Sequence, residues 1–217
     1  MNKPLLVIVG AGPGVSAGVA KKFGTSGFRV VLVSRTKASL DVYTEELQAQ
    51  GVEAYSVQAD ASDSASLQSA FNQIKAEYGV PEVLVYNAAV INQSNPSSLS
   101  EKQLVDDFKI NVVGALTSAQ QVIPDMIDRK QGTLLFTGGG LALYPAAVLT
   151  SLSIGKAGIR TLAFTLAEEL KPHGIYVGTV TITGFVQRGT FYDPERIAEA
   201  YWELYTTRDQ IETVYKE

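Results

Sequence analysis

The sequence predicts an α/β fold in which a doubly wound parallel sheet carries helices on both faces. Strand-like and helix-like segments alternate along the 217 residues, and the expected strands are continuous apolar runs. Such runs are typical of strands that are buried on both faces, as in parallel sheets joined by crossover helices. The ligand of such a sheet binds at the carboxyl ends of its strands.

The first strand, turn and helix form the stretch around which the rest of the chain is organised. Residues 5–9 are all apolar, and Gly10, Gly12 and Gly14 follow at once. Apolar residues then recur every four positions from Val15, so a helix is expected to begin just before it. A glycine-lined turn before a helix presents backbone N–H groups to a pyrophosphate. The alternative is a turn that only connects two elements.

The remaining elements follow in chain order. Apolar runs predict strands at 29–34, 53–58, 83–86, 133–137 and 175–182, and an edge strand near 211–215. Helical spacing of apolar residues predicts helices around 40–47, 67–78, 99–129, 159–170 and 198–205. The helix from residue 99 opens on a sequence with the form of a capping box, Ser98-Leu99-Ser100-Glu101, and Pro124 is a candidate position for a bend or break.

Composition excludes several classes of function. The formal net charge is −4 and no basic stripe is present, which argues against nucleic-acid binding. The absence of cysteine excludes disulfides, thiolate metal sites and thiol catalysis, and no metal site is expected. No apolar run approaches the roughly 20 residues that span a membrane. The early first strand leaves no room for a signal peptide. We therefore expect one cytoplasmic domain over residues 1–217, with a short substrate-side segment from about residue 185.

Polar and small residues follow the predicted strands where a cofactor would bind. Ser34 and Arg35 end the second strand, where an acid would accept from a ribose 2′-hydroxyl and an arginine accommodates a 2′-phosphate. Arg35 therefore favours NADP(H) over NAD(H), the alternative being a plain surface arginine. Asp60 ends the third strand and either accepts from an adenine amino group or caps the next helix. The lone His173 lies in a helix-stop sequence and is interpreted as structural.

In order along the chain, these motifs resemble the short-chain dehydrogenase/reductase family. The resemblance covers about residues 4–186 and includes Gly10-x-x-x-Gly14, Ser34-Arg35, Asp60, Asn87-Ala88-Ala89, Asn111 before Val112-Val113-Gly114, and Gly155-Lys156-Ala157. It implies a single-domain Rossmann fold, a nicotinamide cofactor, and homodimers or homotetramers. The cofactor contacts it implies are Gly10, Gly12, Pro13, Gly14, Val15, Ser34, Arg35, Asp60, Ala61, Asn87, Ala88, Ala89, Lys156, Thr183 and Gly184.

The resemblance also assigns roles in catalysis. In the family, the position of Asn111 organises a proton relay through a helix irregularity. The position of Lys156 bonds the nicotinamide ribose and lowers the pKa of a catalytic tyrosine. That tyrosine lies four residues before the lysine, and Leu152 stands there in this chain. Its partner serine lies thirteen residues earlier still, at the position of Gly139. The usual acid and its orienting hydroxyl are both missing.

Other side chains are candidates for the missing proton donor. Tyr144 lies in the loop after the fifth strand, which borders the substrate in the family, and its alternative is a packing residue beside Pro145. Ser151 and Ser153 flank Leu152 and reach the cleft if the helix is rotated or irregular. Their alternative is polarity at the helix surface or an interface. Two smaller departures from the family are Ser16 in place of a glycine of the turn and Thr183 in place of a proline.

We interpret the chain as an NADP(H)-dependent oxidoreductase that acts on a small carbonyl or alcohol with an atypical proton donor. The alternative is a catalytically inactive NADP(H)-binding sensor or regulatory subunit, and a third reading is a structural protein without a cofactor. Homo-oligomers are expected through helices 99–130 and 150–171, unless their small residues only pack on the sheet. Those residues are Ala115, Ser118, Ala119, Ala163 and Ala167.

Overall fold

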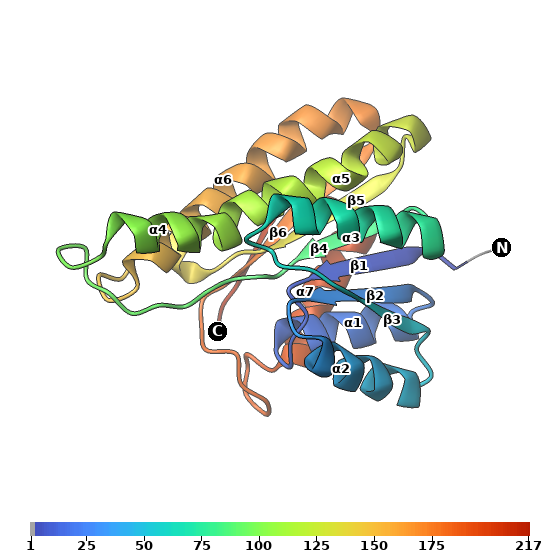
Figure 1. Cartoon of the computed structure of the whole chain (residues 1–217), viewed down its shortest axis with the longest axis horizontal. Coiled ribbons are helices and arrows are strands. Elements are labelled where there is room, and N and C mark those ends of the chain that lie inside the picture. The colour runs from blue at the N-terminus through green and yellow to red at the C-terminus, as the bar shows by residue number, and fades with distance from the viewer. Residues whose placement is uncertain (1–2) are drawn as a thin grey trace.

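The computed structural model describes residues 3–217 and has three layers, a seven-stranded sheet between two layers of helices (Figure 1). The strand order is β3-β2-β1-β4-β5-β6-β7, and every neighbouring pair is parallel. The strands are β1 (Leu5–Val9), β2 (Arg29–Ser34), β3 (Ala54–Gln58), β4 (Val83–Tyr86), β5 (Gly132–Thr137), β6 (Ile175–Ile182) and β7 (Glu212–Tyr215). The predicted fold class, a doubly wound parallel sheet, is confirmed.

The helices divide between the two faces of the sheet. One face packs against α1 (Val15–Thr25), α2 (Lys37–Ala49) and α7 (Pro194–Thr207). The other carries α3 (Ser64–Glu77), α4 (Glu101–Phe108), α5 (Gly114–Arg129) and α6 (Thr150–Leu170). Two short 3-10 turns, η2 (Gly140–Ala142) and η3 (Lys171–His173), precede and follow α6.

The order of the strands opens a crevice between β1 and β4. The chain builds outward from β1 to β2 and β3, then returns to place β4 on the other side of β1. Successive crossovers therefore leave the sheet toward opposite faces at this point, which is where doubly wound sheets bind their ligands. The loops after β1 and β4 are the ones that border it.

The long helix expected over residues 99–129 is interrupted, but not at Pro124. A π-helical segment, η1 (Lys109–Val113), separates α4 from α5, and α5 runs through Pro124 without a break. The Tyr86 hydroxyl donates to the carbonyl of Ile110, and the Asn111 side chain accepts from the Val90 backbone N–H. The end of β4 and the loop after it therefore hold the π-helical segment in place. Such segments inside α-helices occur frequently at functional sites.

Three local expectations are corrected. Ser100, not Ser98, caps α4, because its side chain accepts from Gln103 N, whereas the Ser98 hydroxyl donates to the Asn95 carbonyl. Asp63, not Asp60, caps α3. Four of the five small residues proposed for close helix contact lie inside the protomer, and the fifth, Ala167, is half-buried and packs against the core. Ala115, Ser118, Ala119 and Ala163 are fully buried, whereas the outer faces of these helices expose Val105, Phe108, Leu116 and Ile154.

Two further features concern membranes and metals. Among residues 3–217, no helix has both the length and the apolar character needed to cross a bilayer. Over the same range, no group of three His, Asp or Glu side chains is arranged to hold a metal ion. The aromatic residues of α7 join the core, and Tyr201 is completely buried.

Candidate functional site

The glycine turn after β1 is shaped by Gly10. Its φ is +90°, and a Cβ atom there would lie 2.3 Å from the backbone nitrogen of Ala88. Gly10 N donates to the Val33 carbonyl at 2.9 Å, and its carbonyl accepts from Asn87 Nδ2 at 2.9 Å. The ends of β1, β2 and β4 are therefore joined through one residue that must be glycine.

Ser16, which stands where the family usually has glycine, closes the same turn. Its side chain is 1% exposed. The hydroxyl accepts from Gly12 N at 2.8 Å and donates to the Gly12 carbonyl at 3.0 Å. The departure from the family pattern therefore braces the turn from behind instead of disrupting it. Gly12 itself faces open space, because no atom lies within 4 Å of a Cβ placed on it.

A cavity of about 360 Å³ lies in front of the turn, along the carboxyl ends of β1 to β4. It brings together ten of the residues that the sequence assigns to the cofactor: Gly10, Gly12, Pro13, Ser34, Arg35, Asp60, Ala61, Asn87, Ala88 and Ala89. Gly14, Val15, Lys156, Thr183 and Gly184 are not in its lining. The Thr183 hydroxyl instead donates to the Tyr215 carbonyl at 3.0 Å and lies 3.1 Å from the Tyr192 hydroxyl.

Arg35 and Asp60 give the cavity one exposed cation and one carboxylate. Asp60 Oδ1 accepts from Ser62 N at 2.8 Å and from the Ser62 hydroxyl at 2.7 Å. Burial opposes ionisation of Asp60, yet these hydrogen bonds and the charge of Arg35 hold its pKa below the ordinary value. The carboxylate is therefore ionised at neutral pH and accepts hydrogen bonds.

A chain of hydrogen bonds connects the turn to α7. The Tyr201 hydroxyl donates to the Thr137 hydroxyl at 2.7 Å, and that hydroxyl donates to Asn87 Oδ1 at 2.9 Å. Asn87 then donates to Gly10, as described above. Burial raises the pKa of Tyr201, so the hydroxyl stays protonated and keeps donating. Sequence reasoning missed Thr137 and Tyr201, because only the fold brings them to Asn87.

Lys156 is a residue of α6, and its side chain reaches the end of β5, beside the hydrogen bonds that run from Tyr201 to Asn87. Its Nζ donates to the Thr137 carbonyl at 2.7 Å. A Cβ placed on Gly139 would be 3.2 Å from each of Cγ, Cδ and Cε of the lysine, so the lysine stem runs over the bare glycine. Burial lowers the pKa of Lys156 to about 8.

Asn111 lies in the π-helical segment and is 2% exposed. A Cβ on Gly155 would lie 2.7 Å from Asn111 Cβ and 2.8 Å from Nδ2, so α6 approaches this segment closely. Within residues 3–217, Asn111 Nδ2 has no hydrogen-bond partner. A buried amide without a partner is costly, and this one lies beside the residue that precedes Lys156.

The two serines that flank Leu152 are buried and already bonded, which corrects the expectation of surface or interface polarity. The Ser151 hydroxyl donates to Asp107, a carboxylate that is 2% exposed and also accepts from Asn92 and Gln103. The Ser153 hydroxyl donates to the Leu149 carbonyl at 2.9 Å. Leu152 itself is 5% exposed. Neither hydroxyl is therefore available to a substrate in this arrangement.

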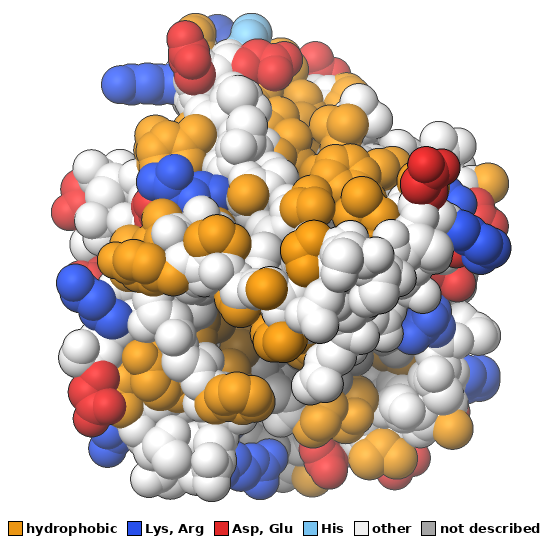
Figure 2. Space-filling view, turned by 90° about the vertical axis from the view of Figure 1, so that its left-hand side faces the viewer, with side chains coloured by type: hydrophobic (Ala, Val, Ile, Leu, Met, Phe, Trp, Pro, Cys, Tyr) orange, Lys and Arg blue, Asp and Glu red, His pale blue; other side chains and the backbone are white. Residues whose placement is uncertain are grey.

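Tyr144 is neither packed beside Pro145 nor part of the cavity lining, since it is 76% exposed. It belongs to a group of exposed apolar side chains on the loops that follow β4, β5 and β6, together with Ile91, Val148 and Phe185. The first two of these loops run side by side, because Ser94 N donates to the Val148 carbonyl at 3.0 Å. Figure 2 looks onto this edge of the sheet, where hydrophobic side chains are spread across the face.

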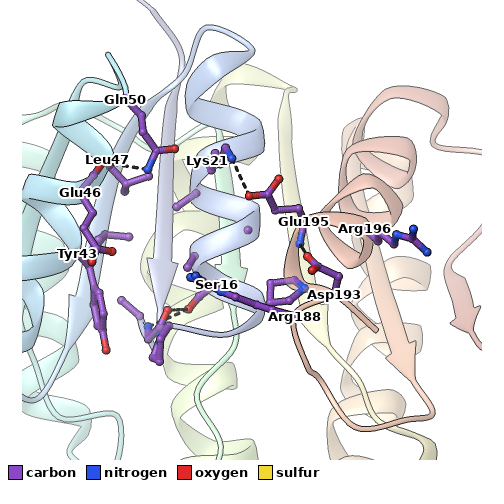
Figure 3. Close-up of a pocket in the computed structure, with 18 residues that line it drawn as sticks. Ser16, Lys21, Tyr43, Glu46, Leu47, Gln50, Arg188, Asp193, Glu195 and Arg196 are labelled. Carbon is purple, nitrogen blue, oxygen red and sulfur yellow. Dashed lines mark hydrogen bonds and ion pairs between the residues drawn. The ribbon is translucent and has the colours of Figure 1, made fainter. Parts of the chain in front are cut away.

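A second cavity, of about 590 Å³, lies on the other side of the glycine turn, between α1, α2 and the start of α7 (Figure 3). Lys21 and Glu195 form an ion pair of 2.7 Å across it. Arg188 reaches across the start of α1 beside Ser16. The sequence analysis did not single out Arg188 as a residue that lines a cavity. It is the first charged residue after Gly184, which follows β6, and this position near the carboxyl end of a strand could have indicated it.

A doubly wound sheet with a glycine turn, a cavity at the strand-order reversal and a lysine at the end of β5 defines a dinucleotide-binding protein. A family model described as short chain dehydrogenase matches residues 4–193. The chain therefore belongs to the short-chain dehydrogenase/reductase family, a family of oxidoreductases. This confirms the family that the motifs resemble.

Individual relatives are 28–30% identical to this chain in sequence. Oxidoreductase UcpA of Salmonella typhimurium is 30% identical over 177 residues, which are 80% of this chain and 66% of UcpA. Very-long-chain 3-oxoacyl-CoA reductase of Pyrenophora tritici-repentis is 29% identical over 179 residues, 80% of this chain and 52% of that protein, so this chain spans about half its length. The crystal structure of a metagenomic short-chain oxidoreductase in complex with NADP aligns with a TM-score of 0.88 and 28% identity, covering 97% of this chain and 96% of that one.

Proposed function

We propose that the protein is an NADP(H)-dependent oxidoreductase that interconverts a small carbonyl compound and its alcohol. The observation that carries the proposal is the cavity that joins the glycine turn to Arg35 and Asn87 at the strand-order reversal. A relative of 28% identity that is described in complex with NADP supports the choice of cofactor. A relative named as a 3-oxoacyl-CoA reductase supports reduction of a carbonyl.

The residues present fit a nicotinamide dinucleotide. The open space in front of Gly12 leaves room for a pyrophosphate at the start of α1, and Arg35 offers a cation to a 2′-phosphate. Asp60 accepts from an adenine amino group, and Ala88 and Ala89 let the backbone approach a ring. Lys156 bonds the nicotinamide ribose. When bound, the reduced cofactor supplies the hydride.

The proton has to come from a group other than the family's tyrosine. In this proposal Tyr144, Lys156 and Asn111 are the chain's own candidates, with the first two as donors and Asn111 as an organiser of the relay. Tyr144 would have to turn inward from a position that is 76% exposed. Lys156 already lies at the end of β5. A general acid contributes roughly 10²–10⁴-fold to a rate, so a weaker donor gives slow turnover and not none.

The first prediction is that the purified chain oxidises NADPH with at least one member of a panel of small ketones and β-keto esters. NADPH is expected to bind and react better than NADH, because only NADPH carries the phosphate that pairs with Arg35. Loss of cofactor absorbance measures turnover, and nicotinamide fluorescence measures affinity. NADPH binding without turnover over the whole panel would favour the inactive cofactor-binding protein instead.

Arg35→Ala is the test of the preference itself. A charge-assisted hydrogen bond is worth about 1.5–3 kcal/mol, so the dissociation constant for NADPH should rise roughly tenfold to hundredfold while that for NADH stays nearly constant. Arg129→Ala, at the exposed end of α5, is the matched control and should change neither constant. Equal affinity of the wild type for the two cofactors would contradict the preference.

We also propose that the chain forms a homodimer or homotetramer through the outer faces of α4, α5 and α6. Val105, Phe108, Leu116 and Ile154 lie on those faces and are 37–53% exposed. Clustered apolar side chains on a helix surface are typical of association surfaces. The second prediction is a dimer or tetramer mass in solution at micromolar concentration, which Leu116→Glu should shift toward the monomer. A monomeric wild type would refute it.

A further inference from the structure

We propose that Lys156 itself donates the proton to the substrate oxygen, in place of the tyrosine that this chain lacks. The proposal rests on the oxidoreductase function proposed above and assigns the acid of that reaction. Its basis is the position of the lysine stem over Gly139 and of its ammonium group at the end of β5. In this proposal the lysine transfers the proton itself and does not assist a tyrosine that transfers it.

The stem of Lys156 lies close against residue 139, which is glycine. A Cβ there would be 3.2 Å from three carbons of the lysine, which is tighter than an ordinary contact. A serine at this position would press on the lysine stem, which would have to shift by a few tenths of an ångström. The bare glycine therefore lets the stem lie closer to this turn than a residue with a side chain would.

The ammonium group has hydrogen-bond capacity to spare. An ammonium carries three N–H donors, and Lys156 uses one of them on the Thr137 carbonyl at 2.7 Å. Thr137 ends β5, and its hydroxyl bonds Asn87, which lines the cofactor cavity. Thr137 therefore links the lysine nitrogen to a residue of the cavity wall. The other two N–H donors of Lys156 have no hydrogen-bond partner among residues 3–217, and in the proposal one of them serves the substrate oxygen.

No carboxylate neutralises this ammonium in residues 3–217. Burial is the cause of its lowered pKa, about 8, and the charged groups around α6 are engaged elsewhere. Asp107 on α4 accepts from three side chains, Lys102 on α4 and Lys109 on η1 pair with Asp106, and the Tyr176 hydroxyl on β6 donates to the Gln210 carbonyl. On α6 itself, Arg160 pairs with Glu212 of β7 at 2.7 Å, and Glu168 and Glu169 lie near the far end of the helix, close in sequence to Lys171 and His173 of η3. Glu101 lies at the exposed start of α4, and β5 and η2 carry no titratable side chain.

The step balances without another reactant. The carbonyl carbon accepts a hydride from the reduced nicotinamide, and the electron pair of the C=O π bond moves to the oxygen. That oxygen forms its O–H bond as an N–H bond of Lys156 breaks. The lysine is left as a neutral amine, which regains a proton from solvent before the next turnover. Alcohol oxidation runs the same transfer in reverse and needs the amine form.

This mechanism fixes the sign of the pH dependence. The ammonium form is the donor, so carbonyl reduction should be constant below the lysine pKa of about 8 and fall roughly tenfold per pH unit above it. Alcohol oxidation should rise through the same pH. The pH profile of kcat therefore tests whether Lys156 is the donor.

The third prediction concerns Lys156→Ala, which should lower reductive kcat by about 10²-fold or more, with NADPH affinity measured separately by fluorescence. Added methylammonium should restore part of the rate, because a small amine fits the space the side chain vacates and carries the same proton. Lys171→Ala, at the exposed end of the same helix, is the control and should change nothing. A second readout needs no turnover. With ¹³Cε-labelled lysine, the NMR signal absent from the alanine variant should titrate near pH 8.

The outcomes separate this inference from the function on which it rests. A wild type that binds NADPH and reduces nothing contradicts the proposed function. A working wild type overturns the inference alone if Lys156→Ala retains its kcat, if methylammonium gives no rescue, or if the NMR signal titrates near pH 10. Loss of kcat in Tyr144→Phe, together with a reduction profile that does not fall near pH 8, would assign the proton to Tyr144 instead.

Discussion

Replacing Gly139 by serine together with Leu152 by tyrosine is expected to raise reductive turnover by about 10²-fold. The two substitutions return the hydroxyl that orients a carbonyl and the phenol that protonates it to the positions they occupy in the family. Lys156 then supports a tyrosine instead of acting alone. The gain is placed at the lower end of the range for a general acid, because in our proposal Lys156 supplies a proton in the wild type.

The structure accommodates the first substitution with a small shift. The serine Cβ would press on the lysine stem at 3.2 Å, and a flexible aliphatic chain can move by a few tenths of an ångström. Leu152 lies on α6 one turn before Lys156 and is 5% exposed, so a tyrosine there has to direct its ring toward the cleft. Steady-state kinetics with NADPH and the best ketone of the panel measure the gain.

The matched control is Gly139→Ala with Leu152→Phe, which has nearly the same shape but neither hydroxyl. It should show no gain, and its turnover should not exceed that of the wild type. In the hydroxyl-bearing pair, the fall of reduction at alkaline pH should follow the new tyrosine. Equal turnover in the two double variants would mean that the cleft fails for a reason other than the missing acid.

Gly10→Ala is expected to destabilise the protein by about 3 kcal/mol or more, the largest stability effect we predict. The new Cβ would lie 2.3 Å from the backbone nitrogen and 2.5 Å from the Cα of Ala88, and backbone cannot move aside as a side chain can. The φ of +90° is also strained for any residue with a Cβ. Urea denaturation of the apo protein measures the loss.

Gly12→Ala is the control from the same turn. Its Cβ would meet no atom within 4 Å and its φ is not positive, so the free energy of unfolding should stay within about 0.5 kcal/mol of the wild type. NADPH affinity should fall, because the methyl group enters the open space in front of the turn. If Gly10→Ala were as stable as Gly12→Ala, that result would contradict the close contact between Gly10 and the Ala88 backbone.

The sequence by itself determined the order and type of the elements. The strands at 29–34, 83–86 and 175–182 have the predicted bounds, because each is rich in β-branched and apolar residues and is bounded by polar or glycine residues. Ten of the residues singled out in the sequence line the cavity in front of the glycine turn for a related reason. Parallel strands bring their carboxyl ends to one edge, so residues that end successive strands are neighbours in any such sheet.

Only the tertiary structure decided where side chains point and what they bond. The resemblance to the family implied a helix irregularity at Asn111, but the hydrogen bonds that join this segment to Tyr86 and Val90 are not part of any local helix pattern. The small residues of α5 and α6 turned out to face the sheet, because a helix with a weak apolar stripe does not state which side is buried.

The contact of the Lys156 side chain with Gly139 could likewise not be predicted from the sequence. These residues lie on different elements, and their contact exists only once β5 and α6 have packed together. The same holds for the hydrogen bonds that run from Tyr201 through Thr137 to Asn87. Local pattern fixes period and polarity along the chain, whereas a contact between distant residues forms only when packing brings their elements together.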